Sequence, residues 1–341
     1  MAIVGGFDVH RAQITFDEVD TETGEICTGQ IRPATRTNLR KWLEPLAERA
    51  DVAFAVEGCT GWRFVAEELG RAGIEVHLAE PADTATLRGT KKRAKTDRAD
   101  ARHLRELLSQ NRLPESWVAP EHVLEVRALG RLYVGLMDER RQWQQRIHAT
   151  LFHHGAPPIK HLLTESGRQA LDATVLSAAG HRVVETALSV IDHLSTQIDP
   201  LRSELADLGR HHVGSRALMS HYGIGTLTAP IIWAEMGDCR RFSSSDKAVR
   251  HTGLDITVWS SDNKRSGPGH LARQGPPALR WALVEAAQCA ARPSSPDHGY
   301  YLEVKARAGA NRAALSVARK LARRVHHHLR SLGDEAWLEA A

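Results

Sequence analysis

The amino-acid sequence predicts a mixed α/β domain at the N-terminus, followed by a long helical arm and a mainly helical C-terminal domain. Short β-prone runs alternate with helical runs as far as Ala79. Helical spacing then continues through residues 121–153 and again through 182–210. After His212, short helical runs are separated by loops rich in Gly, Ser and Pro. These three patterns define the expected order of domains.

The 341 residues exceed what one hydrophobic core usually organises, so we expect several domains. We place the α/β domain at residues 1–155, the arm at 156–213 and the C-terminal domain at 214–341. With 42% hydrophobic and 25% charged residues, the composition excludes a wholly disordered or collagen-like chain. The net charge of +4 decides little about partners, and the distribution of the charges is more informative.

The cysteines and the apolar runs argue against further classes of protein. The four cysteines lie far apart and form no CxxC pair, which suggests neither a zinc ribbon nor a disulfide framework. No basic segment precedes an apolar one at the start, and no apolar run approaches the roughly 20 residues that span a bilayer. We therefore expect a cytoplasmic protein with no membrane-inserted segment.

The α/β domain is expected to begin with an antiparallel meander, because three β-prone runs are separated by short, turn-rich segments. These runs are residues 3–9, 13–19 and 25–31. A helix, a continuous apolar strand typical of a buried sheet centre, a second helix and a further strand should follow at 37–49, 52–56, 62–72 and 74–79. Pro81 opens another short helix, and residues 96–111 form the next one.

The arm is predicted from two long helical runs that a break at residues 155–158 separates. The second run, 182–210, carries an apolar stripe close to a heptad repeat, which Pro200 interrupts. We expect an antiparallel helical arm or coiled coil. Its stripe favours dimers that pair into a tetramer on nucleic acid.

Two carboxylates stand at the ends of strands that should be buried. Asp8 lies inside GFDVH, and Glu57 ends the apolar run 52–56. Burying an isolated carboxylate is costly unless a cation or hydrogen-bond donors meet it. Strand ends in α/β sheets are also where functional sites are assembled. Taken singly, each acid is equally compatible with a loop cap or an arginine partner.

Two further acids, Asp97 and Asp100, lie three residues apart, on one face of the helix predicted at 96–111. They could simply favour the helix dipole, with Thr96 as the cap. A basic strip that runs from Arg88 to Arg105 surrounds them and includes Lys91, Lys92, Arg93 and Lys95, which suits phosphates. Four carboxylates, with neither His nor Cys among them, form a hard-oxygen ligand set that suits Mg²⁺ or Mn²⁺. Two such ions could hold the attacking and the leaving oxygen of a phosphodiester.

The order of GFDVH, AVEG and KTDRADARHL resembles the ribonuclease H fold of Holliday-junction resolvases of the RuvC type. It is more closely similar to the DEDD transposases of the insertion-sequence 110 family. The resemblance implies a ribonuclease H fold for the N-terminal domain. It also implies that Asp8, Glu57, Asp97 and Asp100 hold the divalent metal.

The segment 251–283 resembles the C-terminal signature of the same family over its whole length. By position in that signature, the family's nucleophilic serine falls on Ser261, and its neighbour Ser260 stays open as an alternative. Without the resemblance, Ser-Ser-Asp-Asn is simply good turn chemistry. Lys264 and Arg265 follow closely and could stabilise phosphate charge.

Two glycines, Gly223 and Gly225, form a Gly-x-Gly turn before a helix expected to begin near Thr226. Such a turn can present backbone N–H groups to a phosphate, although an ordinary helix start would use the same residues. The turn is similar to the helix-hairpin-helix element of the family. A basic helix at 306–332 closes the chain, and its three consecutive histidines point in different directions, which disfavours a metal site.

The resemblance implies an insertion-sequence DNA recombinase of prokaryotes, in which Ser261 attacks a phosphodiester to give a transient protein–DNA ester. It also implies guidance by a structured non-coding RNA. One alternative is a metal-dependent junction nuclease without serine chemistry. The other is a non-catalytic nucleic-acid-binding protein, and the intact carboxylates and serine loop argue against it.

Overall fold

The computed structural model describes residues 2–47, 49, 51–88, 96–256, 260–261, 264–265 and 271–339. The chain forms two compact units, Met1–Val118 and Ala119–Ala341. Both of the boundaries expected from the sequence, after residues 155 and 213, fall within the second unit. Among the described residues, no helix has the length and apolar character needed to cross a bilayer.

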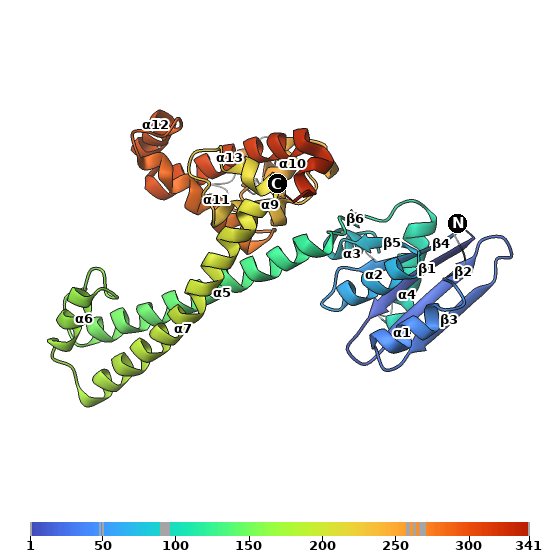
Figure 1. The fold of residues 1–341 in the computed structure, drawn as a ribbon, viewed down its shortest axis with the longest axis horizontal. Helices are drawn as coiled ribbons and strands as arrows, with labels where there is room; N and C mark the ends of the chain where they lie inside the picture. The colour runs from blue at the N-terminus through green and yellow to red at the C-terminus, as the bar shows by residue number, and fades with distance from the viewer. Residues whose placement is uncertain are drawn as a thin grey trace. The chain divides into compact units, whose positions relative to one another are not determined.

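The first unit is built on one six-stranded sheet with the order β3-β2-β1-β4-β5-β6 (Figure 1). The first three strands form the predicted antiparallel meander, whereas β4 and β5 run parallel to β1. A short antiparallel edge strand, β6, was not predicted. The strands are β1 Ile3–Val9, β2 Ile14–Asp20, β3 Ile26–Ile31, β4 Val52–Glu57, β5 Glu75–Ala79 and β6 Glu115–Ser116.

Helices cover both faces of this sheet, and alternate strand positions face each layer. On one face, Phe7 and Phe54 stack at 4.6 Å and pack against α1 and α2. On the other face, Val4 and Ala53 pack against Leu104 of α4. The helices are α1 Arg36–Leu43, α2 Trp62–Arg71, α3 Pro81–Thr86 and α4 Asp97–Ser109.

Gly6 allows α4 to lie directly on the centre of β1. A Cβ added at this position would lie 2.3 Å from the Ala101 carbonyl oxygen and 2.8 Å from the Arg105 backbone nitrogen. No side chain therefore fits there without moving the helix. The close approach brings the first turn of α4 to the end of β1, where Asp8 lies.

The second unit contains the predicted antiparallel arm, formed by α5 (Glu121–His153) and α7 (Ala178–His211) (Figure 1). Ala187, Ile191 and Ile198 of the α7 stripe are buried. The Arg202 guanidinium donates a hydrogen bond to Tyr133 of α5 at 3.3 Å. The helix α7 continues through Pro200. An additional helix, α6 (Glu165–Asp172), packs its Leu171 into the cluster where α5 ends and α7 begins.

Six α-helices, with α9 buried among them, form the rest of the second unit in the described part of the chain. Trp233 of α9 is fully buried, and its indole N–H donates to the Ala336 carbonyl oxygen at 2.8 Å. The helices are α8 Val213–Leu218, α9 Thr228–Met236, α10 Ser245–His251, α11 Pro277–Gln288, α12 His298–Ala308 and α13 Ala310–Leu332. The 3-10 helices η1 Cys239–Arg241, η2 Cys289–Ala291 and η3 Gly333–Trp337 complete the unit, with strands β7 Ser260–Ser261 and β8 Lys264–Arg265.

Candidate active site

Asp8 and Glu57 lie side by side on two central strands of the first unit. The parallel register pairs Phe7 with Val56, so the next residue on each strand is the carboxylate. Gly6 and Ala55, two positions earlier, face α4, and the period of two places Asp8 and Glu57 on that same face. Two carboxylates from separate segments therefore meet at one edge of the sheet.

Helix α4 brings Asp97 and Asp100 toward this edge. Thr96 caps the helix, as expected, by accepting a hydrogen bond from the Ala99 backbone N–H at 3.2 Å. Asp97 is the first helical residue, and its side chain is 42% exposed. Asp100 lies one turn further and pairs with Arg88 at 2.6 Å. The first turn of α4 can therefore contain both the helix cap, Thr96, and the candidate metal ligands, Asp97 and Asp100.

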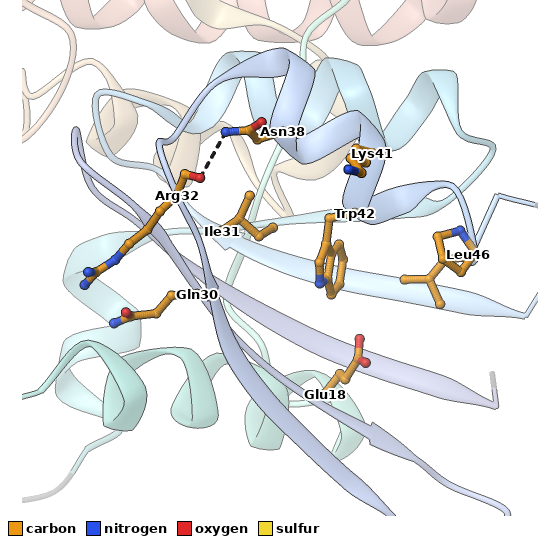
Figure 2. Close-up of a pocket in the computed structure, with 9 residues that line it drawn as sticks. Glu18, Gln30, Ile31, Arg32, Asn38, Lys41, Trp42 and Leu46 are labelled. Atoms are coloured by element: carbon orange, nitrogen blue, oxygen red, sulfur yellow. Dashed lines mark hydrogen bonds between the residues drawn. The ribbon is translucent and has the colours of Figure 1, made fainter.

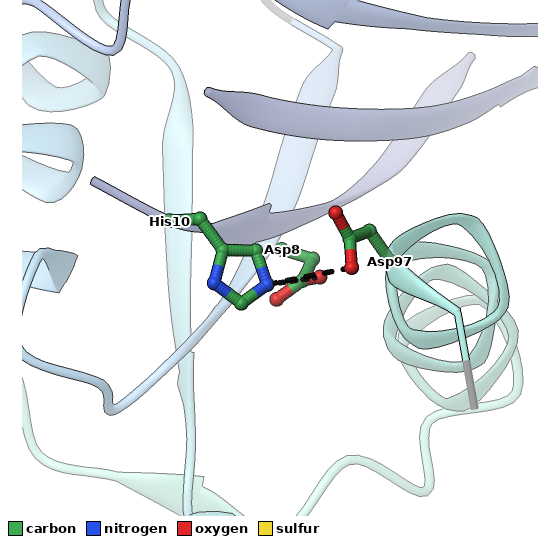
Figure 3. Close-up of side chains that lie close together, drawn as sticks. All are labelled: Asp8, His10 and Asp97. Carbon is green, nitrogen blue, oxygen red and sulfur yellow. Dashed lines mark hydrogen bonds and ion pairs between the residues drawn. The ribbon is translucent and has the colours of Figure 1, made fainter. Parts of the chain in front are cut away.

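His10 joins Asp8 to Asp97, which the sequence had not suggested. Its Nε2 lies 3.1 Å from Asp8 Oδ2 and 3.6 Å from Asp97 Oδ1 (Figure 3). The available sequence signal was its position two residues after Asp8, which places both side chains on one face of the strand end. His10, Asp8 and Asp97 offer ligand atoms that all lie within 4.8 Å of one another.

Gln13, which lies with His10 in the turn between β1 and β2, also binds Asp97. Its side-chain amide donates to Asp97 Oδ2 at 2.9 Å, and its amide oxygen accepts a hydrogen bond from Arg32. The His10 backbone N–H donates to the Gln13 carbonyl oxygen at 2.9 Å, which closes the turn between β1 and β2. The turn therefore presents His10 and Gln13 together to Asp97.

Burial raises the pKa of the Asp8 carboxyl above its usual range. The nearby charge of His10 opposes this shift, whereas Asp100 and Asp97 add to it. A carboxylate in such surroundings gains strongly from a bound cation. The donor set of carboxylate oxygens and one imidazole nitrogen fits a divalent metal ion.

The basic strip beside the carboxylates is only partly described by the structure. Lys91, Lys92, Arg93 and Lys95 lie outside the described residues. At the ends of the strip, Arg88 pairs with Asp100 and Arg105 pairs with the fully buried Asp17. The sequence interpretation treated both arginines as part of a phosphate-binding strip, whereas each has an internal carboxylate partner.

A separate pocket lies on the opposite face of the sheet, between α1 and strands β2 and β3 (Figure 2). Its volume is about 550 Å³. Trp42 and Glu18 point into it, and burial raises the pKa of the Glu18 carboxyl. Arg32 on its rim is the same residue that donates to Gln13.

The predicted nucleophile lies in a short β-hairpin of the second unit. The backbone of Ser261 pairs with Lys264, and that of Ser260 pairs with Arg265. On the N-terminal side of the hairpin, Arg319 of α13 donates to the Leu254 carbonyl oxygen at 2.6 Å. An isolated bridge between Ile256 and Leu271 brings the two ends of the segment together.

In the Gly-x-Gly turn before α9, the position of Gly223 requires glycine, whereas that of Gly225 does not. Gly223 has a φ of 92°, and a Cβ there would lie 2.2 Å from the Ala286 carbonyl oxygen. The Gly225 N–H, however, donates to the Thr228 hydroxyl at 3.0 Å, so this group is already used inside the turn. Helix α9 begins at Thr228, two residues later than expected.

Comparison with known families matches both units of the chain. A DEDD transposase model of the IS110 family matches residues 5–154, and the model described as "Transposase IS116/IS110/IS902 family" matches residues 215–302. The transposase for insertion sequence element IS1328 of Yersinia enterocolitica is 26% identical over 240 residues, which cover 69% of each chain. A probable family 20 transposase of Pseudomonas aeruginosa is 23% identical over 335 residues, covering 93% of this chain and 94% of the relative. The chain therefore belongs to the IS110 family of transposases, enzymes that cleave DNA and transfer its strands.

Proposed function

We propose that this transposase recombines DNA with a metal centre in the first unit and a serine nucleophile in the second. One observation supports the metal centre: the carboxylate of Asp8, at the end of β1, lies within 4.8 Å of that of Asp97, at the start of α4. In this proposal Glu57, beside Asp8 on the neighbouring strand, and Asp100, one turn after Asp97, complete the set of four carboxylates. The strand order, with a meander followed by two parallel strands, supports a RuvC-like ribonuclease H fold for this unit.

In this proposal Asp8, Glu57, Asp97 and Asp100 hold Mg²⁺ or Mn²⁺, which would neutralise charge on the reacting phosphodiester. The fold holds these carboxylate side chains in position. Asp8 is fixed by its strand, and Asp97 is fixed by Gln13 and by the helix cap. Arg88 is bonded to Asp100 Oδ1, so in this proposal the other oxygen, Oδ2, is the metal ligand and Arg88 orients the carboxylate.

Ser261 is the proposed nucleophile. Its oxygen forms a bond to phosphorus while the bond from phosphorus to one sugar oxygen breaks, and that oxygen leaves as a hydroxyl after taking up a proton. The resulting ester conserves the bond energy for rejoining. The family match over residues 215–302, a range that includes Ser261 and its hairpin, supports this assignment.

Nucleic acid is the proposed partner of several backbone and side-chain groups. We assign phosphate contacts to Lys91, Lys92, Arg93, Lys95, Gly223, Lys264 and Arg265, and leave out Gly225 because its N–H donates to Thr228. The turn around Gly223 would serve as a helix-hairpin-helix-like element. A structured non-coding RNA would be held largely through phosphates and shape, and base pairing would supply the specificity.

A dimer that pairs into a tetramer remains part of the proposal. The stripe of α7 packs against α5 of the same chain, so it is not itself the surface between subunits. Phe152 and Val175, at the end of the arm, are 82% and 89% exposed and offer an apolar contact. Light scattering of the protein with nucleic acid tests this assembly, and a strictly monomeric active complex contradicts it.

The metal assignment is tested with four single variants, Asp8→Asn, Glu57→Gln, Asp97→Asn and Asp100→Asn. Each removes one charge but keeps the shape of the side chain. We expect each to lose strand cleavage in Mg²⁺ and Mn²⁺ while it stays folded and binds nucleic acid. Full cleavage in EDTA, or in any two of these variants, would exclude the metal centre.

The serine assignment is tested by trapping the adduct. The reaction is denatured and digested, and peptide mass spectrometry identifies the residue esterified to DNA. Ser261→Ala should lose both adduct and recombination, whereas its matched control Ser260→Ala should retain a measurable part of each. Cleavage at the wild-type rate by Ser261→Ala, with free DNA ends, would identify water as the nucleophile and the protein as a metal-dependent nuclease.

A further inference from the structure

We propose that His10 is a protein ligand of the metal ion, which gives the site a mixed nitrogen and oxygen donor set. This inference rests on the proposed metal centre and adds a residue outside the four carboxylates. The consequence is a preference for divalent transition metals such as Mn²⁺ over Mg²⁺.

The distances fit one ion shared by His10, Asp8 and Asp97. Ligands at about 2.1 Å from an octahedral ion lie roughly 3 Å apart when adjacent and about 4.2 Å apart when opposite. His10 Nε2 lies 3.1 Å from Asp8 Oδ2 and 3.6 Å from Asp97 Oδ1, and all three ligand atoms lie within 4.8 Å of one another. A small closure of the Asp97 side chain, which is 42% exposed, brings all three to ligand positions.

The local backbone directs His10 toward this point. His10 follows Asp8 by two residues at the end of β1, and its own N–H is fixed by the Gln13 carbonyl oxygen. Figure 3 shows the imidazole Nε2 pointing at both carboxylates. The His10 side chain is 54% exposed, which leaves room for water on the remaining coordination positions.

Imidazole changes which ions the site binds best. Mg²⁺ prefers oxygen donors and loses its waters reluctantly, so a nitrogen ligand adds little to its affinity. Divalent transition ions accept imidazole and bind nitrogen-containing sites in the Irving–Williams order, from Mn²⁺ upward. Removal of His10 should therefore affect Mn²⁺ much more than Mg²⁺.

The test measures metal binding to the full-length protein without DNA. Mn²⁺ is titrated into wild type, His10→Ala and His10→Gln, and free Mn²⁺ is quantified by electron paramagnetic resonance; Mg²⁺ is measured by competition. We expect His10→Ala to weaken Mn²⁺ binding by roughly 10-fold or more and Mg²⁺ binding by less than about 3-fold. His181→Ala, an exposed histidine on α7, is the matched control and should bind both ions as wild type does.

A second readout detects the ligand itself. Electron spin-echo modulation of bound Mn²⁺ should show coupling to an imidazole nitrogen in wild type and in His181→Ala, and none in His10→Ala. Equal Mn²⁺ affinity of wild type and His10→Ala, with no nitrogen coupling in either, would overturn the inference while leaving the carboxylate centre intact. Mn²⁺ binding to Asp8→Asn at wild-type affinity would instead remove the proposed centre, so the two failures are distinguishable.

Discussion

Arg105 of α4 and Asp17 of β2 form an ion pair in which the Asp17 carboxylate is fully buried and the Arg105 side chain is 10% exposed. The pair joins the helix that carries Asp97 to the strand that follows His10. It therefore fixes the position of α4 on the sheet, and with it the distance between two carboxylates of the candidate metal centre. A second arginine, Arg102, approaches the same carboxylate at 3.7 Å from a more exposed position.

Breaking this pair should destabilise the first unit. Arg105→Met leaves a buried charge without its main partner and should lower the free energy of unfolding by about 3 kcal/mol or more. Replacing both residues, Asp17→Val with Arg105→Met, should restore most of that loss because no buried charge remains. Urea denaturation measures the effect. Arg102→Met is the control and should cost less than about 1 kcal/mol, because its guanidinium is exposed.

Gln13 should control metal affinity without binding metal itself. Its amide donates to Asp97 Oδ2, and Arg32 fixes the amide through its oxygen. Partners that orient a metal ligand typically contribute about 10- to 100-fold in metal affinity. We expect Gln13→Ala to weaken Mn²⁺ binding by roughly 10-fold and Gln13→Glu to weaken it further, because a second carboxylate would face Asp97 without donating. Calorimetry of both variants decides this, and unchanged Mn²⁺ affinity in Gln13→Glu would show that Gln13 does not orient Asp97.

The layered fold of the first unit could be predicted because local pattern and burial agree. The apolar run at 52–56 became the central strand β4, with Phe54 and Ala55 fully buried. Among the elements that were missed, β6 and α6 are short and depend on neighbours distant in the sequence. Leu171 of α6 is buried only because the ends of α5 and α7 meet there. No periodicity within eight residues reveals such a contact.

Asp8 and Glu57 could be singled out as candidate ligands because acids at the ends of buried strands are unusual, whereas His10 and Gln13 could not. His10 and Gln13 lie in a turn, where polar residues are expected in any protein. Arg105 was misread because composition alone cannot show that its partner, Asp17, lies 88 residues earlier. Pairing across the fold, which decides whether a cation meets phosphate or carboxylate, is visible only in three dimensions.

His251, at the end of α10, is a buried histidine whose surroundings oppose its charge. Burial lowers its pKa to about 4, and the positive charges of Arg241 and Arg127 act in the same direction. Its Nε2 lies 3.1 Å from the Glu235 carbonyl oxygen, which alone favours the charged ring, and 3.2 Å from the Arg241 guanidinium. The Glu235 carboxylate is paired with Arg131.

Acid should therefore destabilise the second unit through His251. Its pKa is lower in the folded chain than the ordinary 6.5, so the unfolded chain binds the proton more readily. The stability that neutral His251 provides is complete above pH 6.5 and is lost as the pH falls from 6.5 to about 4. At about 1.4 kcal/mol per pKa unit, the complete loss between pH 6.5 and pH 4 is roughly 3–4 kcal/mol. Urea denaturation at pH 7 and pH 4.5 should show a smaller difference for His251→Gln than for wild type, because glutamine cannot take up the proton. An equal pH dependence of both proteins would mean that His251 is already charged in the folded chain or exposed to solvent.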